Sequence, residues 1–195
     1  MRGGAYEHLR HLLRRQKKRR EIGVPLDATL LISVGELSAR KNHKVAVEAL
    51  QELPENYWYI IIGKGSLKDE LESIDRTGRL KLLGYRTDIA ELLQCSDVFV
   101  FPSLQEGLPV ALMEAMASGL PVACSRIRGN VDLIDDENCL FEPTDIKGIE
   151  KAIRYVLSQD LGKMATHNLE AVRKFSLKEV AQRMEEIYRQ GIDGK

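Results

Sequence analysis

The stretch DVFVFPSLQEGLPVALMEAMASGLPVACS, residues 97–125, holds two apolar runs with a helix-like segment between them. The first run ends before Pro102, and Pro109 stands where the first position of a helix tolerates a residue without an N–H group. Gly119 suits the position after a helix, and Pro121 opens the second run. The stretch therefore predicts a strand at 97–101, a helix at 109–118 and a strand at 121–125, which is one β-α-β unit.

The chain from Thr29 onward repeats this alternation. Further apolar runs occur at 29–35, 57–63, 80–84 and, more weakly, 139–142, and helix-like segments occur at 42–53, 66–75 and 87–95. Several runs are apolar throughout, as in strands that are buried on both faces. We therefore predict an α/β fold, a Rossmann-like parallel sheet of about six strands with helices on both faces. Residues 145–189 repeat apolar residues at helical spacing, which predicts a helical C-terminus.

The composition limits the class of protein. With 195 residues, 44% apolar and 30% charged, the chain is typical of a globular protein with one sizeable core. Its 29 basic and 29 acidic residues balance, so no global field attracts nucleic acid or anionic lipid. No apolar run approaches the roughly 18 residues of a membrane span, and the first residues lack the apolar core of a signal peptide. Cys95, Cys124 and Cys139 follow no metal-binding spacing, which predicts reduced core residues in a cytoplasmic protein.

The first 25 residues differ from the rest in their charge. The basic residues there follow one another almost without interruption, at Arg14, Arg15, Lys17, Lys18, Arg19 and Arg20. We expect 1–25 to be a basic, helical lead-in or linker, and 26–190 to be the folded domain. A patch for nucleic acid or a membrane surface is the alternative, but a solvated helical face is favoured because no aromatic residues are interleaved for stacking. His8 and His11 are expected to be surface residues rather than metal ligands.

In a parallel sheet, ligands bind beyond the carboxyl ends of the strands, so we expect function in the loops that follow the apolar runs. The segment after Phe101 combines two carboxylates, Glu106 and Glu114, with the start of a helix. The free N–H groups and partial positive charge of a helix N-terminus suit phosphate or sugar oxygens, and Gly107 lets a ligand approach the backbone. Glu114 lies inside the apolar run 110–117, where an unpaired buried carboxylate is costly. We therefore expect it beside the crevice, as an acceptor for the hydroxyl groups of a diol.

Three further features are each open to more than one interpretation. Gly63-Lys64-Gly65 is either a loop that cradles phosphate or a tight turn. Tyr85 either stacks on a base or shields the sheet edge. His43, beside the predicted helix N-cap Asn42, is expected to be a hydrogen-bonding surface residue.

These residues also carry a resemblance to a known family. Glu106 and Glu114 form an E-x7-E pair, with FPSLQEG around the first glutamate and AMASGLPV after the second. Further segments match in order: SVGELSARKNH (33–43), IIIGKGSLKDELE (60–72), LKLLGYRTDIAELLQCSDVFVFPS (80–103) and VRKFSLKEVA (172–181). Over most of residues 29–190 the chain resembles the C-terminal, nucleotide-sugar-binding domain of the GT-B retaining glycosyltransferases of family 4.

The resemblance implies a role for each matching position. Lys41 would meet the donor diphosphate and stabilise the leaving group, Glu106 would bind hydroxyls of the transferred sugar, and these two are the predicted catalytic residues. Glu114 would accept from the ribose hydroxyls. The implied donor-binding residues are Gly35, Arg40, Lys41, Gly63, Tyr85, Arg86, Glu106, Gly107, Leu108, Pro109 and Glu114. Two positions depart from the family pattern: Glu36 replaces an arginine that many members have after the glycine, so Arg40 is expected to supply that contact, and Leu108-Pro109 replaces a glycine-containing segment.

The resemblance further implies a reaction that needs neither metal nor cofactor. The donor is expected to be a UDP-sugar, and the product a hexose transferred in polysaccharide or glycoconjugate synthesis. The acceptor, a saccharide or lipid-linked saccharide, would bind an N-terminal domain that is absent, so the chain alone is expected to transfer nothing.

We expect no nucleic-acid partner, a cytoplasmic location with peripheral contact at the inner membrane face, and self-association through an apolar stripe on a last helix at about 176–190. The alternatives are a standalone nucleotide-sugar-binding subunit and half of a GT-B sugar-nucleotide epimerase.

Overall fold

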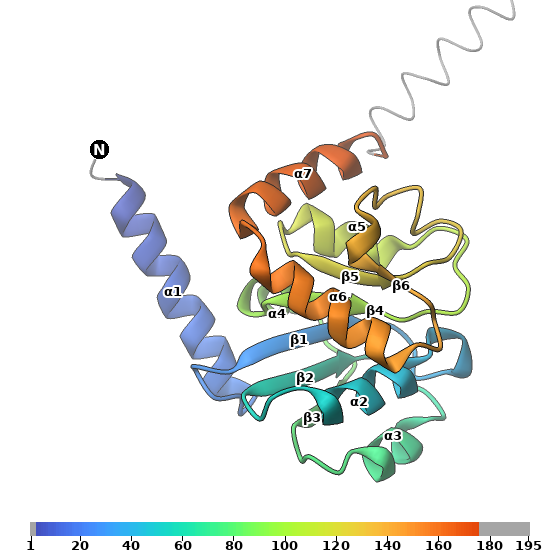
Figure 1. Ribbon diagram of the computed structural model, residues 1–195. Helices are drawn as coiled ribbons and strands as arrows, with labels where there is room; N and C mark the ends of the chain where they lie inside the picture. Colours follow the sequence, from blue (N-terminus) through green and yellow to red (C-terminus); the bar gives the residue numbers. More distant parts are fainter. Residues whose placement is uncertain (1–2, 176–195) are drawn as a thin grey trace, which may run out of the picture.

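The structure, a computed structural model, describes residues 3–175 and is built on one parallel sheet (Figure 1). The six strands lie in the order β3-β2-β1-β4-β5-β6, and every neighbouring pair is parallel. Their bounds are β1 Thr29–Val34, β2 Tyr57–Ile62, β3 Leu80–Gly84, β4 Val98–Phe101, β5 Val122–Ser125 and β6 Leu140–Phe141. The predicted sheet of about six parallel strands is therefore confirmed. The chain direction of the strand order reverses between β1 and β4. Ligands of such sheets bind beyond the carboxyl ends of these two strands, and this region is here called the crevice.

Helices cover both faces of the sheet, as predicted. They are α2 His43–Glu52, α3 Lys68–Ile74, α4 Ile89–Cys95, α5 Val110–Ala117, α6 Ile146–Ser158 and α7 Leu161–Arg173, with short 3-10 turns η1 Ala39–Lys41 and η2 Glu137–Cys139. Right-handed crossovers place α2 and α3 on one face and α4 and α5 on the other. The helix α6 packs against α2, and α7 packs against α5 (Figure 1). Among residues 3–175, no helix has the length and apolar character needed to cross a bilayer.

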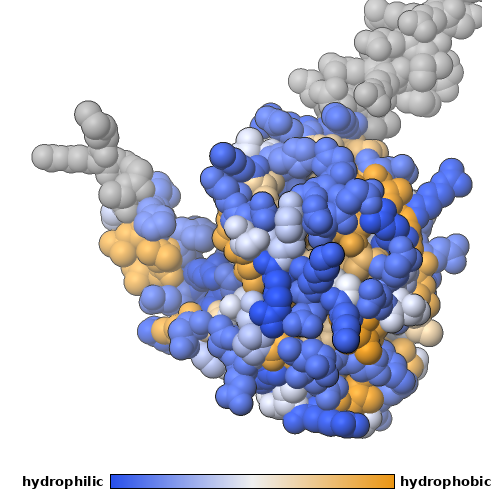
Figure 2. All heavy atoms as spheres, in the orientation of Figure 1, coloured by the Kyte–Doolittle hydropathy of each residue, from blue (hydrophilic) through white to orange (hydrophobic). Residues whose placement is uncertain are grey.

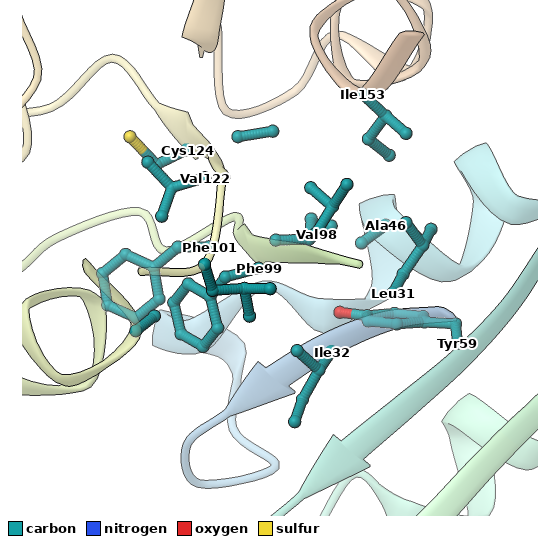
Figure 3. Close-up of a cluster of buried hydrophobic side chains, with 14 of the residues drawn as sticks. Leu31, Ile32, Ala46, Tyr59, Val98, Phe99, Phe101, Val122, Cys124 and Ile153 are labelled. Atoms are coloured by element: carbon teal, nitrogen blue, oxygen red, sulfur yellow. The ribbon is translucent and has the colours of Figure 1, made fainter. Parts of the chain in front are cut away.

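The core lies between the sheet and these helices (Figure 3). The rings of Phe99 and Phe101 on β4 stack with centroids 5.7 Å apart, and both side chains are buried. The Tyr59 hydroxyl on β2 lies 2.6 Å from the Ser33 hydroxyl on β1, so the one polar end of this buried ring is satisfied. Burial raises the pKa values of the thiols Cys124 and Cys139, the latter to about 12. All three cysteines are buried and free, which confirms that they are core residues.

The basic run lies on a helix, α1 Gly3–Glu21, whose C-terminal part is fastened to the domain. The guanidinium of Arg19 is buried and donates to Cys95 O at 2.9 Å, Ala28 O at 2.6 Å and Asp97 Oδ2 at 2.6 Å. The expectation of a uniformly solvated face was therefore wrong for this part of the run. The fold brings acidic side chains that are distant in the sequence close to this helix. The predicted helix at 176–190 and its apolar stripe lie outside the described residues.

Candidate functional site

The crevice between β1 and β4 brings together three charged side chains. Lys41, at the end of η1, places its Nζ atom 2.6 Å from Oε1 of Glu106, which belongs to the loop between β4 and α5. Arg40 places Nη1 3.3 Å from the other carboxylate oxygen. The side chains of Lys41 and Glu106 are only 12% and 6% exposed, whereas that of Arg40 is 49% exposed. The Lys41 ammonium also lies 5.0 Å from the centroid of the Phe101 ring. The structure thus joins both predicted catalytic residues in one nearly buried ion pair.

The loop that carries Lys41 is held against the loop that carries Glu106 by backbone contacts. The Leu104 N–H donates to Arg40 O at 2.9 Å. Asn42 has a left-handed backbone (φ 52°), and its amide donates to Pro102 O at 3.1 Å and to Pro143 O at 2.8 Å. Asn42 does precede α2, but its side-chain oxygen caps no N–H group among the described residues, and its amide hydrogens bond the carbonyl groups of Pro102 and Pro143.

Close backbone packing explains the glycine after β2, Gly63. The Gly35 N–H donates to Ile62 O at 2.9 Å, and a Cβ atom on Gly63 would lie 1.9 Å from Gly35 O. Gly63 also has a φ of +151°. Gly35 itself lies beneath Lys41, since a Cβ there would be 3.2 Å from the lysine Cδ. Packing therefore accounts for Gly63, and its part in donor binding stays a prediction.

The start of α5 forms one wall of the crevice. Leu112, Ala115 and Met116 of this helix are buried, whereas Glu114 is exposed. The apolar run therefore does not bury the carboxylate, because Glu114 lies on the opposite face of the helix. Nothing lies within 4 Å of a Cβ atom placed on Gly107, so the space beside this glycine is open. Leu108 is 62% exposed and Pro109, the N-cap residue, is buried.

The loop after β3 places its two candidate residues in different surroundings. Tyr85 follows Gly84 and is 74% exposed, so its ring does not shield the sheet edge. The Arg86 guanidinium lies 2.6 Å from Asp88 Oδ2 and 2.7 Å from Glu21 Oε1 of α1. Arg86 is thus paired within the fold, whereas the Tyr85 ring is free to meet a ligand.

His43 was expected on the surface, and this expectation was wrong. His43 is the first residue of α2 and only 3% exposed, and within residues 3–175 neither ring nitrogen has a hydrogen-bond partner. Burial, together with the nearby charge of Lys41, lowers the pKa of His43 to about 4. The imidazole is therefore neutral near pH 7.

Sequence reasoning missed a buried polar network under the Glu106–Gly107 loop. The hydroxyl of Ser125, the last residue of β5, donates to Ser103 O at 2.6 Å, and the Asn130 amide donates to Ser125 O at 2.9 Å. Gly129 (φ +93°) packs against the loop, since a Cβ there would lie 3.5 Å from Gly107 O. Serines close to the ends of two adjacent strands, Ser103 near β4 and Ser125 at the end of β5, were the available signal. Their positions fix the loop on which Glu106 lies.

The sheet, its switch-point crevice and the buried lysine–glutamate pair define a domain of the GT-B type. A profile of the family Glycosyl transferases group 1 matches residues 14–175, and the chain belongs to this family.

Similar proteins include a UDP-Gal:alpha-D-GlcNAc-diphosphoundecaprenol alpha-1,3-galactosyltransferase of Escherichia coli, 32% identical over 185 residues (88% of this chain, 48% of the relative). The lipopolysaccharide glucosyltransferase WaaG of Escherichia coli K12 is 28% identical over 195 residues (92% and 51%). The crystal structure of Anabaena Alr3699/HepE in complex with UDP and glucose superposes with a TM-score of 0.81 at 24% identity (91% and 52%). The chain thus spans about half the length of the relatives it matches.

Proposed function

We propose that the crevice between β1 and β4 binds the diphosphate and sugar of a UDP-sugar, and that the full-length protein is a retaining glycosyltransferase that transfers a hexose. The observation that carries the proposal is the ion pair of Lys41 and Glu106 at the switch point, 2.6 Å apart and nearly buried. A cation held in low-dielectric surroundings at a strand end suits a diphosphate. The carboxylate beside it suits sugar hydroxyl groups.

In this proposal the donor takes over contacts that the side chains now make with each other. The Lys41 ammonium exchanges Glu106 for phosphate oxygens and stabilises the negative charge that develops on the leaving diphosphate. Arg40 is half exposed beside the same carboxylate and supplies the second cation. Position 36, where many members of the family have an arginine, holds a glutamate and cannot supply it. These two cations take the role that a metal ion has in other enzymes, so transfer is metal-independent and needs no cofactor.

The wall formed by α5 then contacts the sugar and the ribose. Glu106, once freed from Lys41, accepts hydrogen bonds from hydroxyl groups of the transferred sugar. The open space at Gly107 admits the sugar and diphosphate against the backbone of Leu108 and Pro109. The exposed Glu114 accepts from the ribose hydroxyls, and the exposed Tyr85 ring flanks the base.

The choice of uridine is supported by the relatives. One is named for UDP-Gal, and HepE was crystallised with UDP and glucose. By analogy, this chain is the C-terminal, donor-binding half of a family 4 enzyme in polysaccharide or glycoconjugate synthesis. Its acceptor, a saccharide or lipid-linked saccharide, is bound by another domain at the cytoplasmic face of the membrane. The chain alone then binds donor and transfers nothing, because half of the groups that orient the reaction are elsewhere.

Calorimetric titration tests the proposal. The chain is titrated with UDP, GDP and ADP in the presence of a chelator, together with Glu114→Gln and the matched control Glu170→Gln, an exposed glutamate on α7. We expect selective UDP binding that Glu114→Gln weakens about tenfold and Glu170→Gln leaves unchanged. Failure of all three nucleotides to bind the folded chain would refute the assignment of the crevice, and selective GDP or ADP binding would refute the choice of base. Robust sugar transfer by the chain alone would refute its inactivity.

A further inference from the structure

The helix α1 has two faces of different character. Its inner face is fixed to the domain through charged residues at helical spacing. Arg15 pairs with Asp97 and donates to Ser96 O at 3.2 Å, and Arg19 is buried against the same aspartate. Lys18 lies 2.7 Å from Asp88 and 2.8 Å from Glu91. These contacts hold the helix firmly and determine which side faces away.

The outer face carries an exposed apolar stripe. Tyr6, Leu9 and Leu13 are spaced by three and four residues, so they share one side of the helix, and they are 63%, 54% and 57% exposed. At 100° per residue this side is turned by roughly 130° from that of Arg15 and Arg19, so it faces away from their contacts. Figure 1 shows α1 projecting from the body of the domain, and Figure 2 shows apolar side chains gathered on it among polar ones.

Cations flank this stripe along one side. Arg10, Arg14 and Lys17 are spaced by four and three residues and are all exposed. Within residues 3–175, Arg14 and Lys17 have no acidic partner, and Arg10 has only the exposed Glu7 at 3.7 Å and the Tyr6 ring at 5.8 Å. Residues 1–25 hold eight basic and two acidic residues, whereas the remaining 170 hold 21 basic and 27 acidic. Residues 1–25 therefore have an excess of basic residues, whereas the rest of the neutral chain has an equal excess of acidic residues.

We propose that the outer face of α1 docks the domain on an anionic lipid bilayer. A helix with aromatic and leucine side chains on one face and arginine and lysine beside them lies in the plane of a membrane interface, with the apolar stripe among the acyl chains. Each cation near an anionic surface adds to the attraction, so Arg10, Arg14 and Lys17 add to the burial of the stripe.

The charge distribution favours a bilayer over a second copy of the chain. Two α1 helices packed through their stripes would bring Arg10, Arg14 and Lys17 of both copies together with only Glu7 to compensate them, and like charges at an interface are unfavourable. A bilayer presents a continuous negative surface instead. The inference deepens the proposed function, because it would hold the donor site near a lipid-linked acceptor, but the docking surface does not depend on the donor site.

Flotation with vesicles tests the inference. Binding is measured on phosphatidylglycerol and on phosphatidylcholine vesicles at low and high salt. Arg10→Glu/Arg14→Glu/Lys17→Glu is compared with Lys147→Glu/Lys151→Glu/Lys163→Glu, which changes the net charge equally at exposed positions of α6 and α7. Leu9→Gln/Leu13→Gln is compared with Leu161→Gln/Leu169→Gln, two exposed leucines of α7.

We expect binding to phosphatidylglycerol that weakens with salt, and little binding to phosphatidylcholine. The α1 charge variant should lose at least about tenfold in affinity, and its control much less. The α1 leucine variant should also lose several-fold, unlike its control.

Three outcomes would overturn the inference. They are no binding of the folded chain to phosphatidylglycerol, equal losses in the α1 variants and their controls, and a lipid-free dimer in light scattering that Leu9→Gln/Leu13→Gln abolishes. The last outcome would identify a second copy as the occupant. UDP titration of every variant keeps this test separate from that of the donor site, because none of the substituted residues lies in the crevice.

Discussion

The ammonium of Lys41 lies 2.6 Å from the carboxylate of Glu106, although 65 positions separate the two residues in the sequence. Each follows a different strand, and the strands are neighbours at the point where the sheet order reverses. Replacing the lysine should therefore affect both the stability of the fold and the binding of a ligand in the crevice. Lys41→Met leaves Glu106 nearly buried with Arg40 at 3.3 Å as its remaining cation.

We expect Lys41→Met to lower the free energy of unfolding by about 2–4 kcal/mol and to weaken UDP binding at least about tenfold. Denaturant unfolding and calorimetric titration measure the two effects. Lys44→Met is the control, because Lys44 pairs with Glu70 on the surface at 2.9 Å and should contribute less than about 1 kcal/mol. Equal losses of stability in both variants would contradict the importance of the buried pair.

Substitution by alanine should affect stability and UDP binding differently at two glycines of the crevice. Gly63→Ala places a Cβ atom 1.9 Å from Gly35 O at a φ of +151°, so we expect a loss of roughly 3 kcal/mol or more in stability, or failure to fold. Gly107→Ala enters open space and should change stability by less than about 0.5 kcal/mol while weakening UDP binding. Thermal unfolding and titration separate the cases. A Gly107→Ala variant with wild-type affinity would show that the ligand does not approach this backbone.

The ion pairs between α1 and the loop after β3 should make stability depend on acid pH. The hydrogen bond from Arg86, with a further one from Lys18, holds the pKa of Asp88 below its usual range. A carboxylate with a lowered folded-state pKa stabilises the fold above the ordinary carboxyl pKa of about 4, and the contribution is lost as pH falls below that value. We expect Asp88→Asn to cost about 1 kcal/mol at pH 7 in denaturant unfolding, and the difference from wild type to shrink toward pH 2. A difference that does not change with pH would contradict the electrostatic origin.

The buried His43 should have the opposite kind of pH dependence to a paired histidine. Its folded pKa of about 4 lies below the ordinary value of about 6.5, so the unfolded chain binds the proton more readily. Stability should therefore fall as pH is lowered from about 6.5 to about 4, by roughly 1–3 kcal/mol from this residue. His43→Phe fills the same site without the charge, and its unfolding free energy should lack that slope. Identical slopes in wild type and variant would show that His43 does not titrate in this range.

The strands of the fold could be predicted from sequence because each is a short apolar run with its own ending. The run at 97–101 became β4 at Val98–Phe101, and the run at 121–125 became β5 at Val122–Ser125. Burial on both faces leaves no polar alternation, and that pattern is local. The apolar or polar character of the residues was therefore enough to locate these strands in the sequence.

Contacts between distant residues could not be predicted in the same way. The run that holds Arg19 was expected to be a solvated face because no aromatic residues are interleaved in it, yet Arg19 is buried against Asp97, which lies 78 positions away. His43 was placed on the surface because it follows a polar residue, but it became the first residue of α2 and faces the core. In both cases the burial of the side chain depends on how its helix packs in the tertiary structure. A local sequence pattern does not predict that packing.

The amide of Asn42 joins three parts of the chain, since it lies after β1 and donates to the carbonyl groups of Pro102, after β4, and of Pro143, after β6. Asparagine side chains deamidate slowly, which means that the amide is hydrolysed to a carboxylate. At Asn42 the reaction would replace two donors by an oxygen that repels both carbonyl groups, with no change in the length of the side chain. We therefore expect the loss of this single amide to weaken the contacts between the loops that follow β1, β4 and β6.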